Sequence, residues 1–214
     1  MKIVEIKDNK KMTAREIYDK EGYVVLDNFL PIEVANRLNE IYTSETDWEK
    51  IDQVRERHYS HVFKTSADCL PRETEHYIAS FDRSKNIEKS EEFNKIYDEV
   101  IKTLISKALD INLTVYDTRC YRLNPGDLYR THIDDYAGDV GLIYYINKRW
   151  VWDWGGILHV CQDTEMADNS ITSVLPKFNR AVLLNHRVFR FPHFISSVEK
   201  FALEPRYSII SFNR

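Results

Sequence analysis

Apolar residues recur at helical spacing in two segments of the N-terminal half. Val34, Leu38 and Ile41 predict an amphipathic helix over Pro31–Tyr42, a segment whose first residue suits the start of a helix. A longer apolar stripe predicts a second helix over about Glu91–Ala108. Each helix should lay its apolar face on a flat surface. The longer stripe consists of Phe93, Ile96, Tyr97, Val100, Leu104 and Ile105.

The chain before these helices carries a helix-start signal. Thr13 is followed three residues later by Glu16, which is the spacing of a capping box. We therefore expect a short helix over Ala14–Lys20 and a strand over Tyr23–Leu26.

The segment Trp48–Asn86 is charged and aromatic and has little periodicity. We interpret it as long loops with one strand near Ser60–Lys64. Because variable loops outside a rigid scaffold are where recognition is built, this segment is expected to frame the mouth of a substrate site.

After Leu109 the pattern changes to short β-rich runs separated by turn residues, of which Asn124–Asp127 is the clearest. Helices followed by a series of strands predict an α+β chain, in which N-terminal helices pack on an antiparallel sheet or barrel. The predicted strands are Leu113–Leu123, Leu128–His132, Gly141–Ile146, Gly156–Val160, Arg180–Leu184, Phe194–Glu199 and Tyr207–Phe212.

The composition fits one globular domain. With 214 residues, 43% of them hydrophobic, the chain can bury a sizeable core but is marginal for two domains. We predict a single domain over residues 1–214. No stretch approaches a membrane span, and residues 1–8 lack the apolar run of a secretory signal. A cytoplasmic protein without a membrane partner is therefore expected, and its oligomeric state is left open.

Charge and cysteines exclude several classes. The formal net charge of −4 argues against a strong non-specific grip on nucleic acid. Cys69, Cys120 and Cys161 form no CxxC motif and no paired framework, so neither a disulfide scaffold nor a zinc knuckle is expected.

Ligand-type side chains occur at His132 and Asp134, two positions apart. In an extended chain they lie on the same face. His193, about sixty residues on, could complete a face of two histidines and one carboxylate, a set that suits Fe(II) and leaves positions open opposite. The triplet alone is weak evidence, because one His-x-Asp is expected by chance on the order of half the time.

The other histidines give rivals to this set. His186 also follows an apolar strand and is an alternative distal ligand, although Pro192 before His193 favours the latter. The remaining histidines are interpreted as loop, structural or surface residues: His58, His61, His76 and His159.

Support for a small-molecule site comes from Arg206, which begins an otherwise apolar terminal strand. A buried guanidinium is costly without a partner, and its planar fork fits a carboxylate. A dicarboxylic co-substrate would supply that partner. The alternative is a surface ion pair at the start of a strand.

Several motifs, taken in order, resemble the blocks of the Fe(II)/2-oxoglutarate-dependent oxygenases, in their prolyl-4-hydroxylase-like branch. The resemblance covers roughly Cys120–Phe212 and, more loosely, Gly22–Leu38. Agreement of several co-linear blocks is far more specific than one triplet. The blocks are Cys120-Tyr121, Tyr129 to Asp134, Tyr144 to Trp150, Gly155 to Leu158, Pro176 to Arg180, Pro192-His193 and Arg206-Tyr207-Ser208.

The resemblance implies a double-stranded β-helix, a jelly-roll or cupin-like barrel, over residues 111–214, with 1–110 as helical support and substrate-side loops. It implies iron ligation by His132, Asp134 and His193. Two departures are the longer interval between His193 and Arg206 and the altered spacing of Tyr121 from His132. The implied co-substrate residues are Arg206, Tyr145, Tyr121 and Ser208.

The implied activity is hydroxylation of an unactivated C–H bond, with Fe(II), 2-oxoglutarate and O2 as cofactors, succinate and CO2 as co-products, and ascorbate as a candidate accessory. The substrate would be a peptidyl residue or a small metabolite. Asp134 stands where related halogenases have a small residue, which favours hydroxylation. Two alternatives stay open: a non-catalytic binding module on the same barrel, and a nucleic-acid demethylase, which would need a second arginine where this chain has only Arg214.

Trp150, Trp152 and Trp154 alternate after the Tyr-Tyr strand. Alternation predicts that they share one face, where packing is a better explanation than a substrate-stacking platform.

Overall fold

The computed structural model describes residues 12–55, 76–132, 134, 138–161, 171–189 and 191–214. The helices are α1 (Ala14–Glu21), α2 (Ile32–Ser44), α3 (Lys85–Lys89), α4 (Glu91–Ile96) and α5 (Lys102–Leu109), with a π-helical segment η1 (Tyr97–Ile101) and a 3-10 turn η2 (Trp152–Trp154). The strands are β1 (Tyr23–Asp27), β2 (Glu49–Arg55), β3 (His76–Arg83), β4 (Val115–Leu123), β5 (Leu128–His132), β6 (Val140–Tyr145), β7 (Leu158–Cys161), β8 (Ile171–Val174), β9 (Arg180–Asn185), β10 (His193–Ile195) and β11 (Arg206–Asn213).

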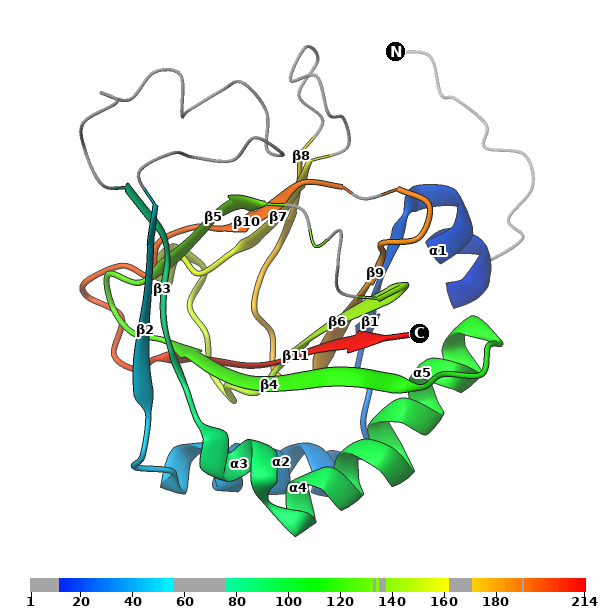
Figure 1. Cartoon of the computed structure of the whole chain (residues 1–214), viewed down its shortest axis with the longest axis horizontal. Coiled ribbons are helices and arrows are strands. Elements are labelled where there is room, and N and C mark those ends of the chain that lie inside the picture. The colour runs from blue at the N-terminus through cyan, green and yellow to red at the C-terminus, as the bar shows by residue number, and fades with distance from the viewer. Residues whose placement is uncertain (1–11, 56–75, 133, 135–137, 162–170, 190) are drawn as a thin grey trace, which may run out of the picture.

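The strands form one curled antiparallel sheet in the order β1-β9-β6-β11-β4-β3-β5-β10-β7-β8, and β2 pairs with β3. The curl brings β5, β10 and β7 opposite β6, β11 and β4, while α2 to α5 lie along the outer side of β4 and β11 (Figure 1). This is the double-stranded β-helix with N-terminal supporting helices that the sequence predicts. No described helix is long and apolar enough to cross a membrane.

Two hydrophobic cores follow from the alternation of side chains across the strands. On β11, Tyr207 and Ile209 point outward into a core shared with the helices, where Leu38, Tyr42 and Phe93 are buried. On the inner face of the barrel a second core forms around Tyr121, Ile143, Tyr145, Leu158 and Ile195. The outer core fixes the helices on the sheet, and the inner core surrounds the side chains described below.

The long predicted helix is divided into three segments. α4, η1 and α5 together cover Glu91–Leu109, as the apolar stripe indicates. The π-helical turn places Tyr97 against the terminal strand, where its hydroxyl bonds Ser211 and Asn213. A π turn adds one residue to a helical turn, so a side chain can be re-aimed without ending the helix.

The expectation of long loops over Trp48–Asn86 is wrong at both of its described ends, where β2, β3 and α3 lie. The strand expected near Ser60–Lys64 falls outside the described residues. Polar contacts hold these strands beside the turn before β5: Lys50 Nζ contacts Asp127 Oδ1 at 2.5 Å and Ser80 Oγ donates to the same atom at 2.7 Å. Ala79 and Phe81 of β3 do alternate into the inner core. An alternation this short, between polar residues, is a weak signal for a strand.

Candidate metal and carboxylate site

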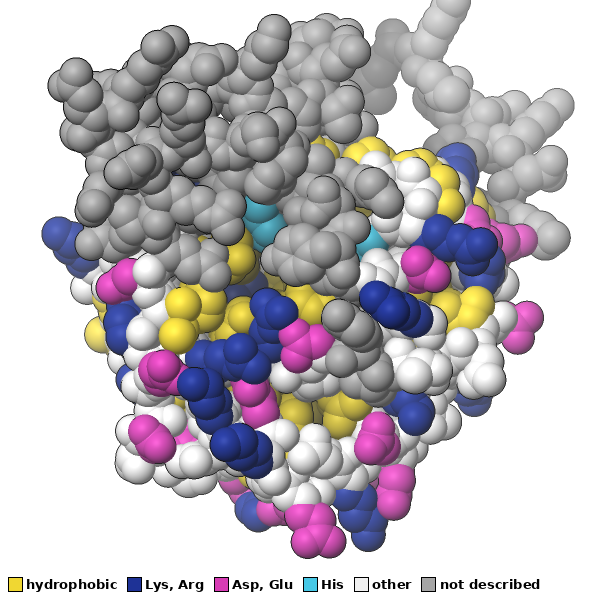
Figure 2. Space-filling view, viewed as in Figure 1, with side chains coloured by type: hydrophobic (Ala, Val, Ile, Leu, Met, Phe, Trp, Pro, Cys, Tyr) yellow, Lys and Arg dark blue, Asp and Glu magenta, His cyan; other side chains and the backbone are white. Residues whose placement is uncertain are grey.

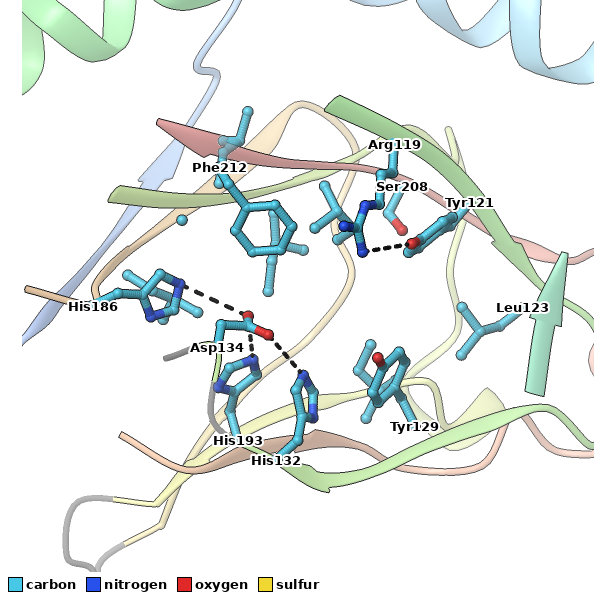
Figure 3. Close-up of a pocket in the computed structure, with 16 residues that line it drawn as sticks. Arg119, Tyr121, Leu123, Tyr129, His132, Asp134, His186, His193, Ser208 and Phe212 are labelled. Carbon is cyan, nitrogen blue, oxygen red and sulfur yellow. Dashed lines mark hydrogen bonds and ion pairs between the residues drawn. The ribbon is translucent and has the colours of Figure 1, made fainter. Parts of the chain in front are cut away.

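The three predicted ligand residues meet at one end of the barrel. β5 ends at His132 and β10 begins at His193, and these two residues are direct partners in the antiparallel ladder. Asp134 follows β5 by two residues. His132 Nε2 lies 3.5 Å from Asp134 Oδ1, and His193 Nε2 lies 3.3 Å from Asp134 Oδ2. One ligand atom from each residue falls within 4.8 Å of the others (Figure 3).

Backbone carbonyls orient both imidazole rings. His132 Nδ1 lies 2.8 Å from the Arg130 carbonyl oxygen, and His193 Nδ1 lies 3.1 Å from that of Phe191. A carbonyl oxygen can only accept, so Nδ1 carries the proton in each ring and the lone pair of neutral imidazole is on Nε2. Metal-binding histidines are usually held by such a bond. Both Nε2 atoms point toward Asp134.

Burial and mutual proximity set the charges of the group. Burial alone would raise the pKa of Asp134, but His132 and His193 beside it lower this pKa below its usual range. Burial and the neighbouring His193 lower the pKa of His132 to about 4. Burial would also lower the pKa of His193, yet its contact with Asp134 raises it. The Asp134 carboxylate is therefore held ionised between the two imidazole rings.

The lowered histidine pKa values predict acid sensitivity of the metal-free protein. His132 and His186 have folded pKa values of about 4 against 6.5, so between these values the unfolded chain binds more protons than the folded one. The free energy of unfolding should therefore fall as the pH is lowered from 6.5 toward 4, and chemical denaturation at several pH values would measure it. A flat profile over this window would contradict the burial of neutral imidazoles. His193 has the opposite effect, because its folded pKa is raised: its contribution to the free energy of unfolding is complete below pH 6.5 and is lost as the pH rises above that value.

Arg206 is fully buried inside the barrel with no acidic partner among the described residues. Its Nη1 donates to Ser208 Oγ at 3.3 Å, and its guanidinium carbon lies 4.8 Å from the centre of the Tyr145 ring. Nε and Nη2 of Arg206 and the hydroxyl of Tyr145 have no hydrogen-bond partner in the described part of the chain. Burial lowers the pKa of Arg206. These orphaned donors fit a carboxylate, which accepts from both arms of a guanidinium.

Gly156 makes room for this arginine. A Cβ atom there would lie 2.8 Å from Arg206 Cδ, and the backbone of Gly156 has φ of +61°, a conformation that favours glycine. The Gly155-Gly156 pair of the sequence is thus required both by the turn and by the buried arginine.

A cavity extends from His132, Asp134 and His193, called the metal-type group below, to the inner face of β11. Tyr121, Tyr129 and Ser208 line it together with His132, Asp134 and His193. Tyr121 accepts a hydrogen bond from Arg119 Nη1 at 3.4 Å, so its own proton is free for an acceptor in the cavity. On the face seen in Figure 2, two patches of histidine side chain are visible above apolar side chains, and lysine and arginine side chains gather below these.

Two cavity residues were not predicted as members of the site: Arg119 was not singled out from the sequence, and His186 was expected only as an alternative to His193. Arg119 lies two residues before Tyr121 on β4, hence on the same face, and that spacing is the signal that could have found it. His186, treated as a rival distal ligand, lies in the same cavity with Nε2 3.8 Å from Asp134 Oδ2. His186 therefore lies next to the set of His132, Asp134 and His193 and is not one of its three members.

The prediction that three tryptophans share one face is wrong. Trp154 is buried, whereas Trp152 is 80% exposed, because the segment forms the turn η2 and side chains do not alternate there as they do on a strand. Trp150 and Trp154 do pack edge to face, at 5.3 Å between ring centres. Packing is thus the role of Trp150 and Trp154, and not of Trp152.

The structure agrees with the prediction that His159 is a structural or surface residue: it is partly exposed on β7 and contacts Ser173. His58, His61 and Cys69 lie outside the described residues, and so does the side chain of His76.

Comparisons with known proteins agree with this geometry. The model of the 2OG-Fe(II) oxygenase superfamily matches residues 116–213. A comparison with curated proteins gives no match. The solved structures named below are 20% identical or less, so these likenesses establish the fold.

Three solved structures illustrate this likeness. A Pseudomonas putida prolyl-4-hydroxylase is 18% identical with a TM-score of 0.55, covering 94% of this chain and 96% of its own. A Trichoplax adhaerens prolyl hydroxylase, in complex with a hypoxia inducible factor peptide fragment, is 20% identical with a TM-score of 0.60, covering 94% and 87%. A 2OG-Fe(II) oxygenase family oxidoreductase from Burkholderia pseudomallei is 12% identical with a TM-score of 0.62, covering 97% and 93%.

Proposed function

We propose, on the premise that this chain belongs to the 2OG-Fe(II) oxygenase superfamily, that it is a dioxygenase which hydroxylates an unactivated C–H bond and releases succinate and CO2. The proposal rests on two features of the same barrel. His132, Asp134 and His193 lie within ligand distance of one another, and the buried Arg206 has no anionic partner among the described residues. A redox-active metal would fill the first site, and a dicarboxylic co-substrate would pair with the arginine.

In this proposal the chain's own residues bind the metal and orient the co-substrate. Nε2 of His132, Nε2 of His193 and a carboxylate oxygen of Asp134 hold Fe(II) on one face. The iron with 2-oxoglutarate and O2 supplies the oxidising power, and the protein supplies position and exclusion of water. Arg206 pairs with the distal carboxylate of 2-oxoglutarate, with Ser208 and the free hydroxyl of Tyr145 as further donors. Tyr121 donates its proton to an acceptor nearer the metal.

The substrate is proposed to be a peptidyl residue or a small metabolite that enters beside Arg119 and Tyr129. Support for a peptide comes from the similar Trichoplax prolyl hydroxylase, whose structure is a complex with a peptide fragment. Hydroxylation is favoured over halogenation because Asp134 retains a carboxylate at the third ligand position. Ascorbate stays a prediction from the sequence, since no described contact bears on it.

We also propose that residues 1–214 act as one domain. The support is the outer core, in which side chains of α1, α2 and α5 pack against β4, β6, β9 and β11. Location in the cytoplasm remains a prediction from composition.

The test is aerobic incubation of the purified protein with Fe(II) and 2-oxoglutarate, with succinate as the readout. Succinate should form slowly without substrate and faster when a panel of peptides and metabolites includes the right compound. Absence of succinate with every compound, together with absence of metal-dependent 2-oxoglutarate binding, would count against an active enzyme.

Two alternatives give different results in the same assays. A non-catalytic module on this barrel would bind 2-oxoglutarate with metal but would not turn it over. A nucleic-acid demethylase would bind oligonucleotides in a salt-sensitive gel shift. The latter is disfavoured by the net charge of −4 and by Arg214, which is the next arginine after Arg206.

A further inference from the structure

A third histidine, His186, faces the metal-type group without being part of it. It follows β9 and is 5% exposed, and its ring lies 6.1 Å from that of His193 and 6.5 Å from that of Phe212. Its Nε2 atom has no hydrogen-bond partner among the described residues. A buried ring nitrogen left unsatisfied costs free energy, so a partner is expected once the site is complete.

A carboxylate oxygen of Asp134 lies just beyond hydrogen-bond distance of this nitrogen. His186 Nε2 lies 3.8 Å from Asp134 Oδ2, roughly 0.6 Å beyond a normal hydrogen bond, so a small side-chain rotation closes the gap. His132 contacts the other oxygen, Oδ1. Figure 3 shows His186 approaching Asp134 from the side opposite His132. His193 Nε2 also lies 3.3 Å from Oδ2, so Oδ2 has two histidine neighbours, whereas Oδ1 has His132.

The sequence leaves space for this ring at Gly141. A Cβ atom on Gly141 would overlap with His186 Nε2. Gly141 is not among the glycines with positive φ, so its backbone would accept any residue. Glycine is thus needed at this strand position for the room it leaves to the His186 side chain.

Resting on the proposed metal site, we propose that His186 is a positioning residue. Its Nε2–H donates to the Asp134 oxygen that the metal does not use, which keeps the carboxylate bound through one oxygen. A carboxylate that chelated through both oxygens would occupy a position needed by the co-substrate or by O2. Hydrogen-bond partners of metal ligands typically contribute 10- to 100-fold in metal affinity.

The experiment is Mn(II) titration of the metal-free protein by calorimetry, on the wild type and four variants. His186→Leu keeps an apolar side chain in the space but removes the donor, and Mn(II) affinity should fall about 10- to 100-fold. His186→Gln keeps an amide donor and should stay within a few-fold of wild type. Gly141→Ala should resemble His186→Leu, because it displaces the ring. His159→Leu is the matched control: its ring stacks on Phe194, whose side chain lies on the opposite face of β10 from that of His193, so this variant should bind like wild type.

A second readout separates positioning from other roles. The Co(II) absorption spectrum should show the same number of nitrogen ligands in His186→Leu and wild type, and metal-free His186→Leu should unfold at a temperature no lower than that of wild type. Wild-type affinity in His186→Leu, equal losses in the Gln and Leu variants, or a nitrogen ligand lost from the spectrum would each overturn the inference. If the wild type itself binds no Mn(II), the proposed metal site fails instead.

Discussion

Replacing Arg206 by methionine is expected to abolish 2-oxoglutarate binding while leaving the metal-free protein as stable as wild type or more stable. The guanidinium is fully buried, and its Nε and Nη2 atoms have no partner among the described residues. Removing it deletes an unsatisfied charge, worth about 1 to 3 kcal/mol of unfolding free energy in the variant's favour. The same change removes the partner of the co-substrate's distal carboxylate, which should weaken 2-oxoglutarate binding by at least about 100-fold.

A paired arginine provides the matched control. Arg122 Nε donates to the buried Asp82 at 2.8 Å, on the outer face of β4. Arg122→Met should therefore lower the unfolding free energy, because it leaves Asp82 without its guanidinium, and should not change 2-oxoglutarate binding. Chemical denaturation and calorimetry with Mn(II) present would measure both quantities. A destabilised Arg206→Met protein that still binds 2-oxoglutarate would show that the arginine is structural.

Replacing His132 by alanine should remove metal binding. His132 contributes one of three ligand atoms, and its Nε2 is directed at the group by the Arg130 carbonyl. Loss of a ligand should exceed the effect of losing a ligand's hydrogen-bond partner, so Mn(II) affinity should fall by more than about 100-fold. Succinate formation should fall with it. His159→Ala serves as the control, and retention of metal affinity in His132→Ala would remove this residue from the site.

Several strands of the C-terminal half could be predicted because they are short runs rich in apolar residues. β6, β9 and β11 are buried on both faces, between the inner and outer cores, and Arg206 stands out in such a strand as a charge at a buried position. The strands β2 and β3 could not be found in this way. Their apolar alternation is short, limited to Ala79 and Phe81 on β3, and many of their contacts are polar, as at Lys50 and Asp127. The sequence carries no signal for which charges will meet.

The residues of the candidate site could be predicted where their spacing along the sequence places them together. His132 and Asp134 share a face because they are two residues apart, and the ordered blocks identify His193 and Arg206. Residues that meet through tertiary structure were not predictable. His186 approaches Asp134 only because β9 and β6 pair in a register that sets it beside Gly141.

The most direct test of the metal site is anomalous diffraction from a crystal grown with Mn(II) and an amide-containing analogue of 2-oxoglutarate. The anomalous peak should lie within bonding distance of Nε2 of His132, Nε2 of His193 and one oxygen of Asp134, and the analogue's distal carboxylate should contact Arg206. A peak elsewhere in the molecule, or an analogue bound away from Arg206, would contradict the account.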